Sequence, residues 1–241
     1  MLVTGAAQRL GRSVSLALGA AGAKVLLHYR RSEQAAESVR SELEERGAEA
    51  ELVAADFADA DGLESFFDGV WTEHGPVTHV VNNASIFPEA TLDSLSLAGL
   101  ESNVRVNAWA PFVLTRCLAH RLVETGERGS VVNLLDSRIV GGDRRHASYH
   151  LSKVLLSVLT RMSAQEFAPA IRVNGVAPGA ILPPAGENEE YVRRLAERLP
   201  LGTGGSLADV ATAVHYLVSS EAVTGQILFV DGGRHLQPEG V

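Results

Sequence analysis

The sequence predicts a Rossmann-like, doubly wound α/β fold: a parallel sheet of about seven strands with helices on both faces. Short, almost continuously apolar runs alternate with amphipathic helical stretches along nearly the whole chain. The first apolar run also leads through a glycine-containing turn directly into the first helical stretch. Strands that read as continuous apolar runs are buried on both faces, and strand-helix repetition of this kind is typical of parallel sheets.

The elements are expected in strict alternation, because each apolar run ends in a turn or polar residue before an amphipathic stretch begins. We expect strands at Met1–Thr4, Lys24–Tyr29, Glu49–Ala55, His79–Asn82, Ser130–Leu135, Arg172–Ala177 and Gln226–Val230. We expect helices near Arg12–Ala21, Ser32–Arg46, Ala60–Glu73, Gly99–Glu124, His146–Ala168 and Leu207–Ser219.

No composition shift or repeat divides the chain, so residues 1–241 are expected to form a single domain. Two prolines at 183 and 184, followed by the charged stretch Glu187–Arg198, indicate an insertion before the last helix. An insertion at this place, beyond the strand ends, is expected to act as a substrate lid around residues 180–200.

Composition excludes several classes of function. The net charge of −8 argues against a nucleic-acid-binding surface. No run approaches the roughly 18 apolar residues of a membrane span, and no signal-peptide pattern is visible. Cys117 is the single cysteine and lies in an apolar helical stretch, so we expect a buried structural thiol and a cytoplasmic location.

The turn after the first strand has the residues of a dinucleotide-binding site. It reads Thr4-Gly5-Ala6-Ala7-Gln8-Arg9-Leu10-Gly11. Gly5 permits a tight turn, Gly11 permits close approach of helix and strand, and the helix N-terminus presents free N–H groups to a pyrophosphate. A plain strand-to-helix turn is the alternative for this segment taken alone.

The end of the second strand favours NADPH over NADH. An acidic residue here would bind the ribose 2′-hydroxyl and repel a 2′-phosphate, but the sequence is His28-Tyr29-Arg30-Arg31-Ser32. Two guanidinium groups and a hydroxyl suit a phosphate, and Arg9 could join them. Adenine and its ribose are expected beside Asp56 and the segment Asn82-Asn83-Ala84.

The catalytic candidates are Tyr149 and Lys153, which are four residues apart and share one face of a predicted helix. A nearby ammonium group is expected to lower the pKa of the phenol by as much as about 3 from its reference value near 10. Asp136 follows the fifth strand, and Asn107 is flanked by apolar residues within the long helix. His146 and His150 lack a third metal ligand, so no metal is predicted.

These motifs together resemble the short-chain dehydrogenase/reductase family over essentially the whole chain. They are TGxxxxxG, NNA, the internal Asn107, YxxxK, and Pro178-Gly179 after the sixth strand. The resemblance implies NAD(P)H-dependent hydride transfer, a tetramer, and catalysis by asparagine, serine, tyrosine and lysine. Asn107, Tyr149 and Lys153 match, but Asp136 stands at the usual serine position.

Within that family, the chain is most similar to the pteridine reductases and the related dihydromonapterin and dihydrofolate reductases. The shared segments are TGAAQRLGRS, HYRRS, Asn83-Ala84-Ser85-Ile86-Phe87, the aspartate and the ending Asp231–Leu236. This resemblance implies that Phe87 stacks a pterin and that Ser85 and Arg9 bind the pterin or the cofactor phosphates. It further implies proton donation by Tyr149 or Asp136.

The remaining roles follow from the same resemblance. Lys153 would hold the nicotinamide ribose, Pro178 and Gly179 would contact the cofactor, and Asn107 would order a proton-relay water. Two other functions remain open at this point: a general ketone or 3-oxoacyl reductase, and a non-catalytic NADPH-binding protein.

Overall fold

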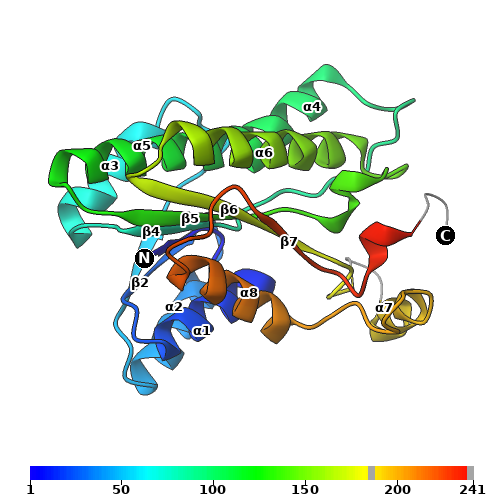
Figure 1. Cartoon of the computed structure of the whole chain (residues 1–241), viewed down its shortest axis with the longest axis horizontal. Helices are drawn as coiled ribbons and strands as arrows, with labels where there is room; N and C mark the ends of the chain where they lie inside the picture. The colour runs from blue at the N-terminus through cyan, green and yellow to red at the C-terminus, as the bar shows by residue number, and fades with distance from the viewer. Residues whose placement is uncertain (184–187, 238–241) are drawn as a thin grey trace.

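The computed structural model describes residues 1–183 and 188–237 and contains one seven-stranded, fully parallel sheet (Figure 1). The strand order is β3-β2-β1-β4-β5-β6-β7, so the order reverses beside β1 and β4. This confirms the predicted fold class. The strands are β1 (Leu2–Val3), β2 (Val25–Tyr29), β3 (Ala50–Ala54), β4 (His79–Asn82), β5 (Gly129–Leu134), β6 (Ile171–Pro178) and β7 (Ile227–Val230).

Helices cover both faces of the sheet (Figure 1). On one face lie α1 (Arg9–Ala20), α2 (Glu33–Glu45) and α8 (Leu207–Ser219), with α1 packed between the other two. On the other face lie α3 (Leu63–His74), α4 (Leu97–Val104), α5 (Ala110–Thr125) and α6 (Ala147–Glu166). The predicted helix and strand boundaries differ from these by only a few residues.

The core has two main layers, because successive strand residues point to opposite faces of the sheet. Leu2 and Leu26 pack beneath α3 and α5, whereas the next residues, Val3 and Leu27, pack beneath α1 and α8. Cys117 on α5 borders the first layer and is half-buried, and burial raises the pKa of its thiol to about 11. The thiol is therefore protonated and suits the structural role expected for it.

The prediction of one regular helix over Gly99–Glu124 was wrong. A π-helical turn, η1 (Arg105–Trp109), separates α4 from α5. Asn107 lies in this turn, and its side-chain amide bonds to the backbone of Ile86 instead of facing solvent. π-Turns of this kind insert one extra residue into a helix and are frequent at functional sites.

The expected lid segment contains a helix that its charged sequence did not predict. α7 (Glu189–Ala196) begins after Asn188, whose side chain accepts a hydrogen bond from the Tyr191 backbone N–H at 3.2 Å. Residues 184–187 of the expected lid lie outside the described residues. Within the described ranges, no helix has the length and apolar character needed to cross a membrane.

His28 joins three strands at the edge of the sheet that carries the glycine-containing turn. The Gly5 N–H donates to its Nδ1 at 3.0 Å, so Nε2 carries the proton and donates to the Ala55 carbonyl at 3.1 Å. The ring is 2% exposed and stacks on Phe57 with a centroid distance of 4.1 Å. Burial lowers the pKa of His28 to about 4, although the Ala55 carbonyl partly opposes this shift. The neutral imidazole therefore fixes the position of the turn.

Acidification should destabilise the protein through His28. The unfolded side chain has a pKa near 6.5, so the unfolded state binds more protons between that value and about 4. Stability is therefore complete above pH 6.5 and falls as the pH drops through this window, by about 2 kcal/mol from pH 8 to pH 5. Urea unfolding at pH 8 and pH 5 should show that His28→Gln loses less free energy of unfolding on acidification than the unchanged protein.

His215→Gln is the matched control, because His215 is exposed on α8. This control should lose as much stability at pH 5 as the unchanged protein. Half-buried His79, whose pKa is also lowered to about 4 by desolvation, contributes in the same direction in all three proteins. If His28→Gln lost as much free energy of unfolding between pH 8 and pH 5 as the control, the role given to His28 would be contradicted.

Candidate active site

The glycine-containing turn between β1 and α1 is closed by contacts that tolerate only glycine at two positions. Gly5 has a φ of 62°, and a Cβ on Gly11 would lie 2.1 Å from the Gly5 carbonyl oxygen. Asn83, after β4, donates from Nδ2 to the carbonyl oxygens of Thr4 and Gly5 at 2.8 and 3.0 Å. The Thr4 hydroxyl in turn accepts the backbone N–H groups of Asn83 and Ala84, each at 2.9 Å.

A cavity of about 340 Å³ lies between this turn and the ends of β2 and β3. Of the predicted cofactor and substrate residues, it brings together Gly5, Tyr29, Arg30, Arg31, Ser32, Asp56, Ala84 and Ser85. It also exposes residues that sequence reasoning missed, namely Ala7, Gln8, His28, Ala55, Phe57, Ile86 and Val106. His28 could have been noticed as an imidazole that follows three apolar residues in a predicted strand.

The cavity has the features that a dinucleotide with an additional phosphate requires. α1 begins at the turn with no acidic residue in its first turn, so its N-terminus suits an anion. Arg30 and Arg31 line the opposite side, and Arg30 approaches Asp56 only loosely, at 3.8 Å. A Cβ on Gly5 would lie 3.0 Å from Ala84 Cα, so this wall of the cavity has no room for a side chain. These residues fit NADP(H).

Other predicted cofactor residues lie at the same edge of the sheet but do not line the cavity. Arg9 donates from Nη2 to the Pro183 carbonyl at 3.0 Å, so its guanidinium is turned toward the start of the lid segment. Leu10 packs against the core, and the Asn83 side chain donates to the Gly5 carbonyl oxygen within the turn. Pro178 ends β6, and the Gly179 N–H donates to β7 at Val230.

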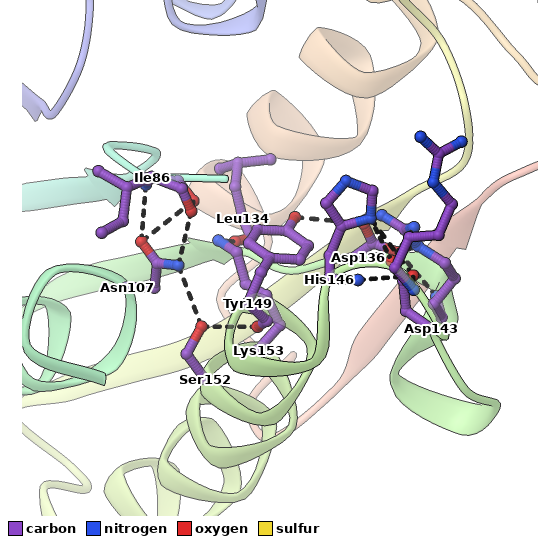
Figure 2. A network of polar contacts seen from close by, with 12 residues as sticks. Ile86, Asn107, Leu134, Asp136, Asp143, His146, Tyr149, Ser152 and Lys153 are labelled. Atoms are coloured by element: carbon purple, nitrogen blue, oxygen red, sulfur yellow. Dashed lines mark hydrogen bonds and ion pairs between the residues drawn. The ribbon is translucent and has the colours of Figure 1, made fainter. Parts of the chain in front are cut away.

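Asp136, two residues after the end of β5, is surrounded by hydrogen-bond donors. Its Oδ1 accepts the backbone N–H of Arg138 at 2.8 Å and Arg138 Nε at 3.0 Å. Its Oδ2 accepts Arg138 Nη2 at 2.8 Å and the Tyr149 hydroxyl at 3.1 Å (Figure 2). Burial alone would raise the pKa of Asp136, but these bonds and the Arg138 charge hold it below its usual value. Asp136 is therefore a carboxylate, and of the two expected proton donors only Tyr149 holds a proton at neutral pH in this arrangement.

Tyr149 and Lys153 share one face of α6, as the spacing predicted, but they do not interact as expected. The Lys153 ammonium donates to the Leu134 carbonyl at 2.6 Å and lies 5.7 Å from the tyrosine ring centre. Burial and the neighbouring Asp136 carboxylate raise the pKa of Tyr149 well above 10. The expected lowering of this pKa was wrong because the carboxylate, and not the ammonium, contacts the hydroxyl.

Burial lowers the pKa of Lys153 itself to about 8, with the Asp136 charge acting against this change. The side chain is 2% exposed and still largely protonated at pH 7. The site thus holds one carboxylate, one protonated phenol and one ammonium group within a buried cluster.

Asn107 has its whole amide group engaged (Figure 2). Its Nδ2 donates to the Ile86 carbonyl and to the Ser152 hydroxyl, each at 3.0 Å. Its Oδ1 accepts the Ile86 N–H at 2.8 Å and the Ser85 hydroxyl at 3.2 Å. The amide therefore fixes the loop that follows β4 and carries the two predicted substrate residues, Ser85 and Phe87.

Phe87 stands beside the catalytic candidates and is 43% exposed. Its ring stacks on His146 at 3.9 Å between centroids and meets the edge of Tyr149 at 4.5 Å. His146 is held in turn by Asp143, whose Oδ2 lies 3.1 Å from its Nδ1. Sequence reasoning missed Arg138 and Asp143, although Arg138 follows Asp136 by only two residues.

Comparisons with known proteins identify the family of this chain. A protein-family model described as Enoyl-(Acyl carrier protein) reductase matches residues 5–235. Among curated proteins, 3beta-hydroxysteroid dehydrogenase 1 of Eggerthella lenta is 33% identical, over 99% of this chain and 94% of its own length. The 3-oxoacyl-[acyl-carrier-protein] reductase FabG of Staphylococcus aureus is 30% identical, over 98% of this chain and 97% of its own length.

Two similar solved structures are both FolM alternative dihydrofolate reductase 1 in complex with NADP. The protein from Brucella canis has a TM-score of 0.93 and 33% identity, over 99% of this chain and 94% of that one. The protein from Brucella suis has a TM-score of 0.93 and 32% identity, over 99% and 96%. NADP is the cofactor form that the sequence predicted for this chain. By its motifs, fold and relatives, the chain belongs to the short-chain dehydrogenase/reductase family of oxidoreductases.

Proposed function

We propose that this oxidoreductase uses NADPH to reduce a C=N bond of a pterin, with dihydromonapterin, dihydrobiopterin and dihydrofolate as the candidate substrates. One observation carries the proposal: a carboxylate, Asp136, stands 3.1 Å from the Tyr149 hydroxyl at the position where the family has a serine. The similarity to two FolM dihydrofolate reductases supports the same substrate class.

The carboxylate changes which substrate the site favours. A serine hydroxyl donates a hydrogen bond to a carbonyl oxygen, whereas an ionised carboxylate only accepts. Reduction of a ketone develops negative charge on oxygen, and a carboxylate about 4 Å away repels that charge by about 4 kcal/mol at an effective dielectric of 20. A pterin instead offers ring N–H and amino groups, for which a carboxylate is the matching acceptor.

Phe87 supports a flat aromatic substrate. Its ring is partly exposed beside Tyr149, and His146 backs it from one side. Offset stacking of aromatic rings adds about 0.5–1.5 kcal/mol beyond the burial of their surface. The Ser85 hydroxyl, placed by Asn107, lies on the same loop and is proposed to bind the pterin or the cofactor.

NADPH is the proposed cofactor, held by the glycine-containing turn and the Arg30–Arg31 pair that line the cavity. When bound, NADPH supplies the hydride. Arg9, Leu10, Gly11, Asn83, Pro178 and Gly179 are proposed to shape or border its site without lining the cavity.

Each side chain then has a defined proton or positioning role. Tyr149 keeps its proton at neutral pH because its pKa is raised, so it serves as the proton donor to the substrate nitrogen. When the hydroxyl turns to the substrate, Asp136 Oδ2 loses that donor and is free to accept a pterin N–H. Lys153 contributes positive charge below the phenol, and Asn107 holds the substrate loop.

A homotetramer is proposed for the assembly. Leu151, Leu155, Val158 and Met162 recur at spacings of three and four on α6 and are 38–60% exposed. Such a stripe suits burial against another helix. A single domain with a lid around residues 180–200, and a cytoplasmic location, are proposed with it.

The main alternative is a ketone or 3-oxoacyl reductase. FabG and a hydroxysteroid dehydrogenase are among the similar proteins, and the tyrosine and lysine serve such chemistry equally well. A protein that binds NADPH without turnover is the third candidate, and the complete tyrosine-lysine pair argues against it.

Substrate choice is tested by following NADPH oxidation with 7,8-dihydromonapterin, 7,8-dihydrofolate, ketones and 3-oxoacyl thioesters. We expect turnover of the pterins, with kcat lost by about 100-fold or more in Tyr149→Phe because the proton donor is gone. Asp136→Ser should lower kcat/KM for pterins by about 10- to 100-fold and raise it for ketones. Turnover of ketones alone would refute the pterin assignment and leave the family and cofactor standing.

Cofactor preference is tested with the double variant Arg30→Met/Arg31→Met. Loss of the two guanidinium groups should raise the KM for NADPH by about 10- to 100-fold and leave the KM for NADH nearly unchanged. Arg46→Met is the matched control, because this arginine is exposed and pairs with Glu42 away from the cavity. Equal effects of the double variant on both cofactors would contradict the assignment of the 2′-phosphate site.

A further inference from the structure

The Arg138 guanidinium makes a bidentate contact with the Asp136 carboxylate. Its Nε lies 3.0 Å from Oδ1 and its Nη2 lies 2.8 Å from Oδ2, and its backbone N–H adds a third bond. Paired contacts of this kind fix both the position and the rotation of a carboxylate. Of the lone pairs of the Asp136 carboxylate, only the one that accepts the Tyr149 hydroxyl is not used by Arg138.

A second carboxylate fixes Arg138 from its other side. Arg138 Nη1 pairs with Asp143 Oδ2, and the Asp143 side chain is only 6% exposed. Asp143 is itself held by the backbone N–H groups of Arg145 and His146, at 2.8 and 3.1 Å. The guanidinium also lies 5.5 Å from the ring centre of Phe87, so it contacts both the anionic and the aromatic part of the site.

Other charged groups face this cluster from two neighbouring elements. From α6 come Tyr149 and Lys153, and the lysine ammonium bonds to a backbone carbonyl and not to Asp136. The other neighbouring element is η3 (Arg234–Leu236), which packs against η2 (Ser137–Val140) and carries Arg234 and His235, and His235 pairs with Asp231. In the described part of the chain, Arg138 is the only cation within ion-pair distance of Asp136.

We propose that Arg138 is a positioning residue: it fixes Asp136 as a carboxylate and turns that carboxylate toward the Tyr149 hydroxyl, with Asp143 as its second anchor. Asp136 then accepts hydrogen bonds and never donates one, and the transferable proton stays on Tyr149. The preference for pterins over ketones that follows from this rests on the proposed function. The charge state and orientation of Asp136 are independent of the proposed function.

The electrostatics agree with the geometry. Burial alone would raise the pKa of Asp136, and the Arg138 contacts reverse this effect. Without the guanidinium, the buried carboxyl group would face Asp143 uncompensated. Its pKa should then rise by about 1 to 3, which is the effect of one opposite charge at this distance.

The direct test is the titration of Asp136, followed by NMR of aspartate labelled with ¹³C at Cγ, with Asp136→Asn used to assign the signal. The unchanged protein should titrate below the usual aspartate value, and Arg138→Met should titrate above the unchanged protein by about 1 to 3 pH units. Arg138→Lys should fall between them, because lysine restores the charge without the planar fork. The same midpoint in all three proteins would overturn the proposal.

Arg145→Met is the matched control. Arg145 lies on the same loop, but its side chain is 70% exposed and pairs with Glu89. This variant should leave the titration of Asp136 unchanged. A shift as large as that of Arg138→Met would show that any loss of positive charge suffices and would overturn the specific role of Arg138.

The pH profile of kcat/KM gives a second readout with any substrate that the unchanged protein turns over. In Arg138→Met, activity should fall on the acid side at a higher pH than in the unchanged protein, because Asp136 becomes protonated there. Lack of pterin turnover would refute the proposed function but leave the NMR result valid. If Arg138→Met does not fold, Asp143→Asn keeps Arg138 and removes its second anchor. An Asp136 midpoint above that of the unchanged protein would then support the proposal, and an unchanged midpoint would overturn it.

Discussion

All seven strands of the sheet run parallel, and for that reason their carboxyl ends meet at one edge. The loops at this edge carry the glycine-containing turn after β1, the arginines after β2, the substrate loop after β4 and Asp136 after β5, and α6 adds Tyr149 and Lys153. The reversal of strand order beside β1 opens the crevice there. His28 and Asn83 then bind the loops to one another, so that the edge is a fixed surface.

Within that edge, the electrostatic character of the site depends on one substitution and its partner. A carboxylate at the serine position would be costly to bury alone, and Arg138 provides the compensating charge. Burial, reinforced by the Asp136 carboxylate, raises the pKa of Tyr149 and keeps the phenol protonated, whereas burial lowers the pKa of Lys153 to about 8 against the effect of Asp136. The proposed proton donor, Tyr149, and the fixed anion, Asp136, are therefore different side chains.

The relatives illustrate why the fold does not decide the substrate. A hydroxysteroid dehydrogenase, a 3-oxoacyl reductase and two FolM dihydrofolate reductases are all about 30–33% identical to this chain. They are similar to this chain over almost its whole length, and the activities in their names differ. We propose that substrate choice depends on the few side chains beside Tyr149: a carboxylate, the guanidinium that holds it, and the exposed ring of Phe87.

The sequence by itself determined the fold class and the motif positions, because apolar periodicity and the spacing of glycines, tyrosine and lysine are local properties. It also determined that Asp136 replaces a serine and that no acid follows β2. Only the tertiary structure decided the charge and contacts of these groups. Lys153 bonds to Leu134, Arg9 turns to Pro183, and Asn107 interrupts a helix to bond Ile86. Each of these contacts joins residues distant in the chain, and a pKa depends on burial and on neighbouring charges that no local pattern encodes.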